Sequence, residues 1–305
     1  MIAHQMTLIK RELWEHRSIW VTPLAIGVIV TLGVLAMLIL ASGFAKELDV
    51  VIFGAQNLAG EAERSAALTG FFLGTSWIFL VALAFLTVFY CLDSLYAERK
   101  DKSILFWRSL PVTDAETVIS KLLTAAFVLP LIMCAGIFAT HLVNLVVTSI
   151  WVSVKGGSAG TLIWGSVPIL DSWLAALIVI ISTGIWMSPF LGWFLLVSAW
   201  TKRMPLLVAF MPIIVVPLLE WIVFRTRLFA TAVAERGDNL PIFRELDIES
   251  FFENEGWRHG IQDLSLLSHL DIGKFLTHPE TWIGLVVCGL LTTAAIYVRR
   301  FRDES

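Results

Sequence analysis

The chain has 305 residues, of which 57% are hydrophobic and only 15% are charged, and its formal net charge is −3. Soluble domains carry charge on about a quarter of their residues, so this composition excludes an ordinary soluble protein and predicts a polytopic membrane protein. The slightly negative balance argues against a general nucleic-acid-binding protein. The cysteines all lie inside apolar stretches (Cys91, Cys134 and Cys288), where they indicate neither a disulfide framework nor a metal site.

The N-terminal segment, residues 1–18, has the pattern of an amphipathic helix that lies in the membrane interface. Its apolar residues recur at helical spacing on one face: Ile2, Met6, Ile9 and Leu13. The charged residues fall off this stripe. The apolar run that follows, residues 19–41, is longer than the hydrophobic region of a signal peptide, so we expect no cleavage here.

Six apolar segments are each long enough to cross roughly 30 Å of hydrocarbon as a helix. They cover residues 19–41, 70–92, 117–149, 172–200, 205–225 and 281–298. The third is longer than a bilayer requires, so it should tilt or project, and Pro130 is expected to kink it. The sixth opens with Thr277, His278, Pro279 and Glu280, a helix-start pattern. The predicted fold class is an all-α integral membrane protein, with residues 1–305 forming one transmembrane domain.

Lysine and arginine indicate the orientation of these spans. On one side they lie in short connections against span ends: Lys10, Arg11, Arg17, Arg99, Lys100, Lys102, Arg108, Lys121, Lys202, Arg203, Arg299, Arg300 and Arg302. On the other side they are sparse or spread over the long acidic connection 226–280. Because positive charge favours the cytoplasmic side, we expect both termini in the cytoplasm and the 226–280 connection outside it.

A polar island, residues 93–121, separates the second and third spans. Charges crowd its first half, and a short amphipathic piece follows at residues 104–110. Pro111 stops that piece because proline cannot continue a helix. Thr113 and Glu116 then form a capping-box pattern that opens the third span. The island therefore predicts a helix end, a short helix lying crosswise and a new helix start, with residues 94–116 as a cytoplasmic loop.

Sequence motifs for catalysis are absent. The chain contains no G-x-x-x-x-G-K-[ST] phosphate loop, no H-E-x-x-H metal pair and no G-x-S-x-G nucleophile motif. We therefore expect no enzymatic activity from the chain by itself. If it moves a molecule against a gradient, the energy must come from a partner chain or from an ion gradient.

The island resembles the cytoplasmic loop between spans two and three of the ABC-2 family of ABC-transporter permeases. That loop has an ordered pattern, matched in this sequence by Glu98-Arg99, Ser103, Leu105-Phe106, Leu110-Pro111-Val112-Thr113 and Lys121. The layout of the whole chain is similar too, with an amphipathic N-terminal helix, six spans and a long connection between spans five and six. The missing phosphate loop fits the bacterial type in which the ATPase is a separate polypeptide.

The resemblance implies an exporter of the type V-like fold in the bacterial inner membrane. Two copies of the permease would form the translocation path, chiefly from spans two and five, and the 226–280 connection would cap it. Two ATPase subunits would bind ATP and Mg²⁺, while this chain would bind no cofactor, metal or nucleic acid. The short helix after span two would be a coupling helix that sits in a groove of the ATPase.

The residues expected to dock the ATPase combine aromatic anchors with charges. They are Glu98, Arg99, Ser103, Leu105, Phe106, Trp107, Arg108, Leu110, Pro111 and Lys121. Aromatic side chains such as Phe106 and Trp107 often dominate the energy of an interface, and Arg99 and Arg108 can pair with acidic groups of a partner. The alternative is that the island is an ordinary basic loop that lies on lipid.

Candidates for the substrate path are Phe72, Phe79, Phe210, Glu220, His141 and Asn144. His141 and Asn144 share a face near the outer end of span three, and polar groups within spans are often functional. Glu220 near the end of span five either pairs with Arg225 or Arg227 or contacts a substrate or gate. Tyr90 and Asp93 are expected to cap the cytoplasmic end of span two.

Two other classes of function remain open from the sequence. An ion-coupled secondary carrier would use Glu220, His141 and Asn144 as its coupling groups. A membrane anchor or assembly protein would have no transport path. A partner ATPase distinguishes the exporter from both.

Overall fold

The computed structural model describes residues 2–43, 61–104, 111–165, 169–243 and 266–301. Within these ranges the chain forms helices α1 (Ile2–Glu15), α2 (Ser18–Gly43), α4 (Glu61–Lys100), α6 (Asp114–Leu123), α7 (Leu129–Val154), α8 (Ile169–Trp186), α9 (Ser188–Trp200), α10 (Pro205–Phe224), α11 (Leu228–Asp238), α13 (Ile272–Thr277) and α14 (Pro279–Phe301). Short π-helical turns occupy Thr124–Val128 and Gly160–Trp164, and a 3₁₀ turn occupies Leu266–His269.

Six helical segments of the described chain are long and apolar enough to cross a membrane. They are Ser18–Leu40, Leu68–Lys100, Asp114–Val154, Ile169–Trp186, Pro205–Phe224 and Pro279–Phe301. The all-α membrane fold with six spanning helices is therefore confirmed. Its apolar surface is large because the helices face lipid or another chain instead of water.

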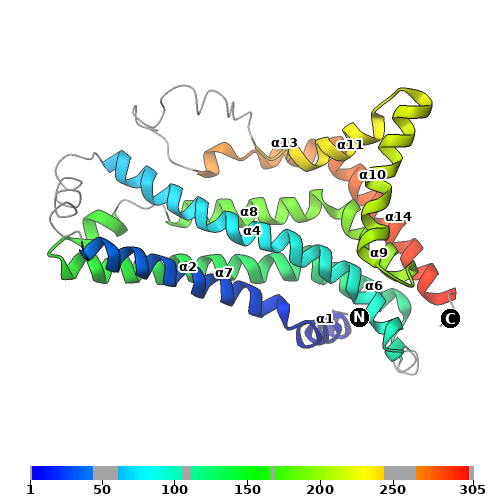
Figure 1. Ribbon diagram of the computed structural model, residues 1–305, viewed down its shortest axis with the longest axis horizontal. Coiled ribbons are helices and arrows are strands. Elements are labelled where there is room, and N and C mark those ends of the chain that lie inside the picture. The colour runs from blue at the N-terminus through cyan, green and yellow to red at the C-terminus, as the bar shows by residue number, and fades with distance from the viewer. Residues whose placement is uncertain (1, 44–60, 105–110, 166–168, 244–265, 302–305) are drawn as a thin grey trace.

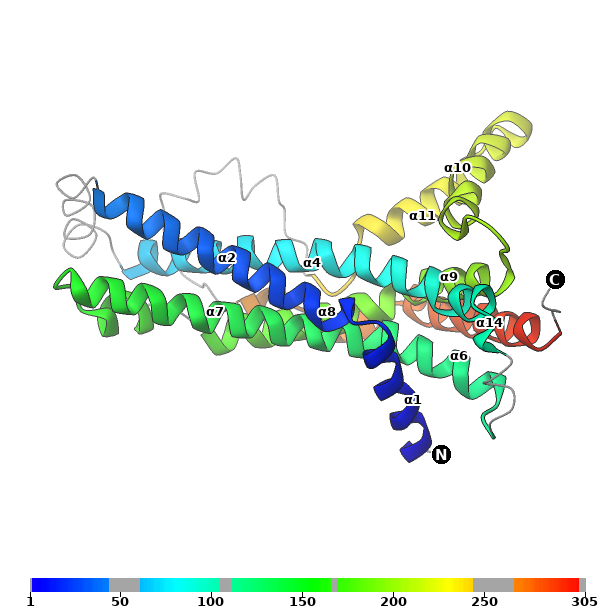
Figure 2. The same cartoon turned by 60° about the horizontal axis from the view of Figure 1, so that its bottom comes forward.

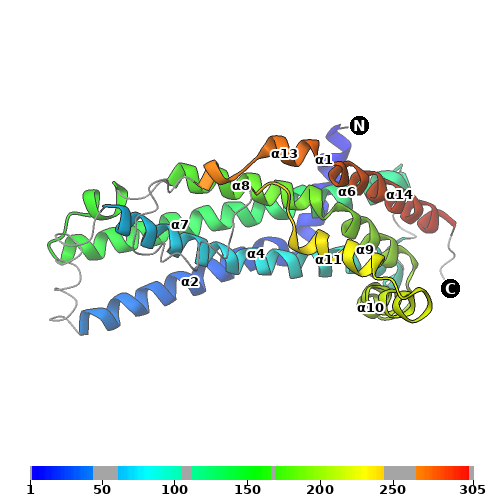
Figure 3. The same ribbon diagram turned by 90° about the horizontal axis from the view of Figure 1, so that it is seen from above.

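Helices α2, α4, α7 and α8 run side by side along the long axis of the molecule (Figure 1). Both chain termini lie at one end of this bundle, together with α1, α6 and the last turns of α14 (Figures 1 and 3). We call this end the terminal end. Helix α10 leaves the bundle there and projects to the side (Figure 2), and Ala209 is the residue of α10 that is buried.

The second span is longer than its apolar run. Helix α4 continues through Lys100 and ends where Lys102 adopts a left-handed φ of 56°. The expectation of a loop from residue 94 was wrong, because Glu98 and Arg99 in the last turn of α4 find partners on other helices and need no solvent. Residues 105–110, where a short crosswise helix is predicted, lie outside the described residues.

The third span begins as its sequence predicts. The Glu116 backbone N–H donates to Thr113 Oγ1 at 3.2 Å, and the Thr113 N–H donates to Glu116 Oε2 at 2.9 Å, which completes the capping box. The expected kink near Pro130 takes the form of the π-helical turn just before it, in which the Leu129 N–H donates to Thr124 O. A wider turn relieves the clash that a proline ring makes with the preceding turn.

The fourth span is two helices instead of the one predicted over 172–200. Helix α8 ends at Trp186 and α9 begins at Ser188, with Pro189 in the first turn of α9. Arg236 of α11 compensates the break, since its Nε donates to Trp186 O at 3.0 Å and its Nη2 donates to Glu280 O at 3.0 Å. Its guanidinium also lies over the Trp186 ring, 4.4 Å from the centroid. A backbone carbonyl that a helix break frees at membrane depth requires such a donor.

Helix α1 turns a different face to the protein than its apolar stripe predicts. Leu8 and Glu12 are buried, whereas Met6 is 67% exposed. Of the stripe residues, Met6 lies on the outer surface, Ile9 is half-buried, and Leu13 is half-buried and packs against the hydrophobic core. The inward face is partly charged because it meets charged partners on other helices.

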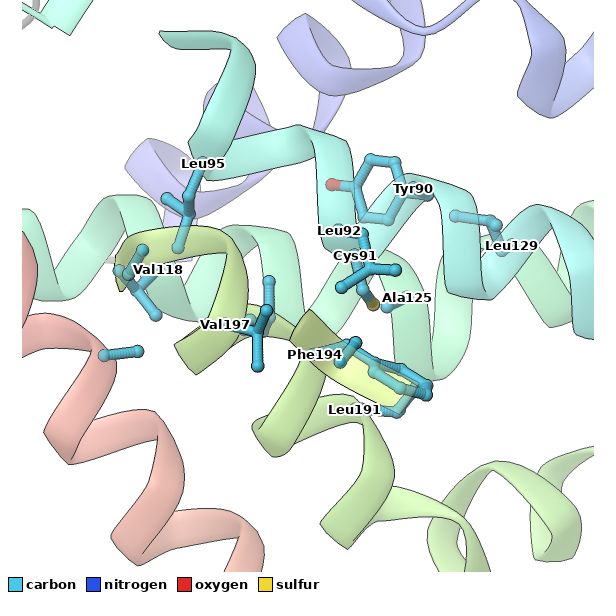
Figure 4. Packing of buried hydrophobic residues seen from close by; sticks show 14 of the residues in the cluster. Tyr90, Cys91, Leu92, Leu95, Val118, Ala125, Leu129, Leu191, Phe194 and Val197 are labelled. Carbon is cyan, nitrogen blue, oxygen red and sulfur yellow. The ribbon is translucent and has the colours of Figure 1, made fainter. Parts of the chain in front are cut away.

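A hydrophobic core lies between α4, α9 and the third span (Figure 4). Helix α4 contributes residues such as Cys91, Leu92 and Leu95, and α9 contributes Leu195 and Val197, each at most 3% exposed. On the other side of α9, Gly192 lets α14 approach, since a Cβ there would lie 3.1 Å from Cys288 O. The core therefore fixes the position of α4 and α14 relative to each other at the terminal end.

Small residues bring α2 and α7 together. A Cβ added at Gly136 of α7 would lie 2.7 Å from the Pro23 Cβ of α2, and one added at Gly27 would lie 2.7 Å from Thr140 Oγ1. Close backbone approach through glycine is a common way for helices to associate in a membrane, where no hydrophobic effect drives them together.

Gly136→Ala should therefore destabilise the contact between α2 and α7. The rigid Pro23 ring cannot turn aside, and overpacking of this kind costs about 1 to 3 kcal/mol. We expect the midpoint of thermal unfolding in detergent to be lower than that of the wild type. Size-exclusion chromatography of heated samples measures this midpoint. The matched control is Gly33→Ala on α2, where nothing lies within 4 Å of the added Cβ. Equal midpoints for the two variants would contradict the close packing at Gly136.

Candidate functional site

Glu98, in the last turn of α4, is the centre of a buried ion network at the terminal end. It is 2% exposed. Its Oε1 accepts from Arg11 Nη2 of α1 and from Lys121 Nζ of α6, both at 3.1 Å. Its Oε2 accepts from Arg299 Nη1 of α14 at 2.6 Å. One carboxylate therefore contacts cations from α1, α6 and α14.

Lys121 extends the network to a second buried carboxylate. It is 0% exposed, and its Nζ donates to Glu12 Oε1 of α1 at 2.9 Å. Glu12 is 1% exposed, and its Oε2 accepts from the Tyr90 hydroxyl of α4 at 2.9 Å. Buried charges persist in proteins when they are paired in this way. The amphipathic N-terminal helix is thus fixed to the bundle by charge as well as by Leu8.

Arg299 joins the two ends of the segment between α4 and α6. Its Nη1 contacts Glu98 just before this segment, and its Nε donates to Asp114 Oδ1 at 2.9 Å just after it. Arg299 is 3% exposed, so water hardly competes for these contacts. A single guanidinium on α14 therefore contacts both ends of the connection between α4 and α6, which lies within the polar island.

Helix α4 is also fixed to the end of α9. Arg99 Nη2 donates to the backbone oxygens of Ser198 and Thr201. The Ser198 hydroxyl accepts from the Tyr96 backbone N–H at 3.0 Å and donates to Leu92 O at 2.7 Å. A side chain from α9 thus inserts between two backbone groups of α4 that would otherwise bond to each other.

Three predicted docking residues are placed inside the protein instead of on its surface. Glu98 and Lys121 are buried in the network, and Arg99 is directed to the end of α9. Each of the three has partners within the chain, and direct contact of these residues with an ATPase stays a prediction. Ser103 donates to Glu98 O at 3.3 Å, and Pro111 is exposed. The remaining docking residues, Leu105, Phe106, Trp107, Arg108 and Leu110, lie outside the described residues.

The other members of this network were not predicted from the sequence. Glu12 and Arg11 stand beside an apolar stripe, and Arg299 looks like an ordinary basic residue at a span end. The usable signal was that predicted span ends on one side of the membrane carry carboxylates and cations together, namely Glu98, Asp114, Lys121 and Arg299. If the span ends carried charges of one sign only, a solvated loop would explain them. Charges of opposite sign at span ends favour ion pairs between the helices.

The predicted path residues fall into separate places. Phe72 of α4 stacks on His141 of α7 with 4.4 Å between ring centroids, and His141 Nε2 lies 3.0 Å from Thr75 Oγ1. Phe72, Phe79, His141 and Asn144 are each at most 2% exposed, so they form part of the interior between α4 and α7. Phe210 of α10 is 38% exposed and lies 5.8 Å from the Phe194 ring.

His141 and Asn144 are buried between helices. Helix α7 continues to Val154, beyond the predicted end of the span at residue 149. The Asn144 side-chain N–H donates to Thr140 O at 2.9 Å. Both side chains are buried within the bundle, so neither is open to water.

Glu220 caps a helix. Its carboxylate accepts from Thr226 Oγ1 at 2.8 Å and from the backbone N–H groups of Leu228 and Phe229 at 2.6 and 2.9 Å. These groups open α11, where a negative charge is favoured by the helix dipole. The expected pairing with Arg225 or Arg227 was wrong, since Arg225 lies over the Trp221 ring. The structure does not bring Glu220 to His141 or Asn144.

Comparison with known families gives a match to the model described as ABC-2 family transporter protein, over residues 66–237. This range is more than half of the chain. It includes α4 from residue 66 onward, the island, the third and fourth spans and α10. The same comparisons found no match among curated proteins or solved structures.

Glu98→Gln should destabilise the folded protein strongly. It leaves Lys121 and Arg299 buried without full compensation, and removing one partner of a buried ion pair typically costs about 3 to 5 kcal/mol. The measurement is thermal unfolding of the purified protein in detergent. Glu15→Gln is the matched control, because Glu15 is 40% exposed and pairs only with Arg11 at 3.0 Å among the contacts described. The network would have no structural role if both variants unfolded at the wild-type temperature.

Proposed function

Because the chain belongs to the ABC-2 transporter family, and is thus a membrane-spanning permease of an ABC transporter, we propose that it forms the path of an ATP-driven exporter. In this proposal two identical copies form the path. A separate ATPase, also in two copies, binds ATP and Mg²⁺ and drives the cycle through the segment between α4 and α6. The chain is a transport subunit and not an enzyme.

The observation that carries this proposal is the arrangement of Arg299. A coupling segment transmits force only if its ends cannot move independently of the spans. Here Glu98 before the segment and Asp114 after it contact the same buried guanidinium. A push on the segment would therefore move α4, α6, α14 and, through Lys121 and Glu12, α1 together.

The distribution of positive charge supports a cytoplasmic position for the terminal end. Exposed basic residues gather there on different helices and turns: Arg17, Lys100, Lys102, Lys202, Arg203 and Arg300. Positive charge in short connections marks the cytoplasmic side. Both termini and the proposed docking segment would then face the cytoplasm of a bacterium, and the protein would lie in its inner membrane.

The uncovered faces of two spans support the dimer. In α2 and α10, the most apolar window of each span has only 6% of its residues buried within the chain. Such faces contact lipid or a second copy. Because α10 projects from the bundle (Figure 2), a second copy would have access to the faces of α10 that do not contact α4, α9 or α11.

An ion-coupled carrier is less well supported. Its proposed coupling groups are separated, since Glu220 caps α11 while His141 and Asn144 lie between α4 and α7. The family match also favours a transporter that uses an ATPase. If transport depended on a proton or sodium gradient and the complex contained no ATPase, the ion-coupled carrier would be favoured over the exporter.

Purification of the tagged chain from its own membrane in mild detergent should recover a soluble protein with a phosphate-loop motif, identified by mass spectrometry. Arg108→Glu should reduce its recovery, because the charge that pairs with an acidic partner is reversed. Arg203→Glu, a charge reversal at an exposed residue between α9 and α10, is the matched control and should retain the partner. Recovery of the chain alone would argue against an ATP-driven exporter, and equal recovery from both variants would argue against docking through Arg108.

Asp114→Asn should uncouple the complex without dissociating it. The substitution weakens the contact with Arg299 after the segment but leaves the contact with Glu98 before it. We expect wild-type recovery of the partner ATPase, continued ATP hydrolysis and a severalfold loss of transport per ATP in proteoliposomes. Transport per ATP equal to that of the wild type would remove Asp114 from the coupling mechanism.

A further inference from the structure

A cleft of about 340 Å³ opens at the terminal end, between the α1–α2 junction, α4 and the start of α10. Its volume is in the range of sites that hold small organic molecules, roughly 300–1,000 Å³. The cleft is lined by residues from Leu86 to Tyr96 along α4, by His16 and Ser18, and by Pro205 and Leu206. It therefore extends from the apolar middle of α4 towards its charged end.

The wall nearer the membrane interior is apolar and accessible. Leu86 and Phe89 of α4 face the cleft together with Leu206 of α10. Phe89 is 56% exposed and Leu206 is 43% exposed, so a large part of each side chain is not covered by other residues of the chain. A molecule that fills this part of the cleft must have an apolar body.

The other end of the cleft holds an unusual carboxylate. Asp93 is exposed and makes no hydrogen bond or ion pair within the part of the chain that the structure describes. The sequence predicted a capping role for Asp93, but α4 continues through Lys100, so there is no helix end at Asp93 to cap. An exposed carboxylate beside apolar and aromatic side chains offers a negative charge to a molecule that enters the cleft.

The other polar groups of the cleft do not neutralise this carboxylate. No lysine or arginine is among the described residues that line the cleft. His16 is engaged elsewhere, with its Nε2 3.8 Å from Glu12 Oε2 and its ring against Tyr90. The rings of Phe89 and Tyr96 add aromatic faces, which attract cations.

We propose that this cleft binds an organic cation with an apolar body, and that Asp93 is the charge partner of that cation. The proposal rests on the proposed transport function and gives it a class of substrate. The apolar body would lie against Leu86, Phe89 and Leu206, and the positive group would lie near Asp93 and Tyr96. An anion of the same size would meet the Asp93 carboxylate and be disfavoured.

The test compares two probes of matched size and opposite charge, tetraphenylphosphonium and tetraphenylborate. Equilibrium binding of each is measured to the full-length protein in nanodiscs, after subtraction of binding to nanodiscs without protein. We expect saturable binding of tetraphenylphosphonium and none of tetraphenylborate. Equal binding of both, or of neither, would overturn the proposal with the wild-type protein alone.

Substitutions then test whether Asp93 supplies the negative charge of the site. Asp93→Asn should weaken tetraphenylphosphonium binding by about fivefold to tenfold, as expected for a partly exposed ion pair with an aromatic contribution. Asp93→Glu should retain binding. Asp101→Asn, the same change at an exposed residue that does not line the cleft, should bind like the wild type. Unchanged binding in Asp93→Asn, or equal loss in Asp101→Asn, would remove Asp93 from the site.

The binding measurement needs neither ATP nor a partner chain. If binding fails while an ATPase is still recovered with the permease, the substrate class is wrong and the exporter proposal stands. If binding succeeds and no ATPase is recovered, the cleft is a binding site on a protein that works by another mechanism.

Discussion

The terminal end of this protein depends on the need of a buried carboxylate for compensation. Glu98 cannot remain charged in a nearly water-free position without Lys121, Arg299 and Arg11, and each of these comes from a different helix. The arrangement of α1, α4, α6 and α14 is therefore set by one charge as much as by packing. Apolar side chains in a membrane gain little by contacting each other instead of lipid, so a directional interaction of this kind decides which helices meet.

The sequence allowed the local features of the fold to be predicted, because their causes are local. Hydropathy located the spans, and Thr113 and Glu116 located the start of the third span through one reciprocal pair of hydrogen bonds. Features with distant causes were missed. Pro189 alone does not reveal that α8 and α9 separate, because Arg236 supplies the donor from another segment. The inward face of α1 was missed because Glu12 meets Lys121 only in the folded chain.

The position of the candidate site along the chain could be predicted from the sequence, but the contacts of its residues could not. The island between spans two and three was identified from Glu98, Pro111 and Lys121, and these residues do lie around the connection that the family match includes. A sequence gives no direct sign of whether a charge faces water or another charge, so Glu98 and Lys121 were expected on the surface. The same difficulty applies to Glu220, whose partners are backbone N–H groups that any sequence would provide. Burial is decided by elements far away along the chain, and the pairwise pattern of charges at span ends is the only trace of it in the sequence.

The position of Arg299 has a consequence for how the protein is made. Glu98 and Arg299 are separated by 201 residues, so the ribosome completes most of the later spans before this pair can form. At about 5 to 20 residues per second, that delay lasts about 10 to 40 seconds. During that time Glu98 has Arg11, which is synthesised before it, and Lys121, which follows soon after it, as its available partners. Assembly of the terminal end is therefore completed only when α14 is in place, and a chain that stops before α14 would leave the buried Glu98 carboxylate without its contact to Arg299.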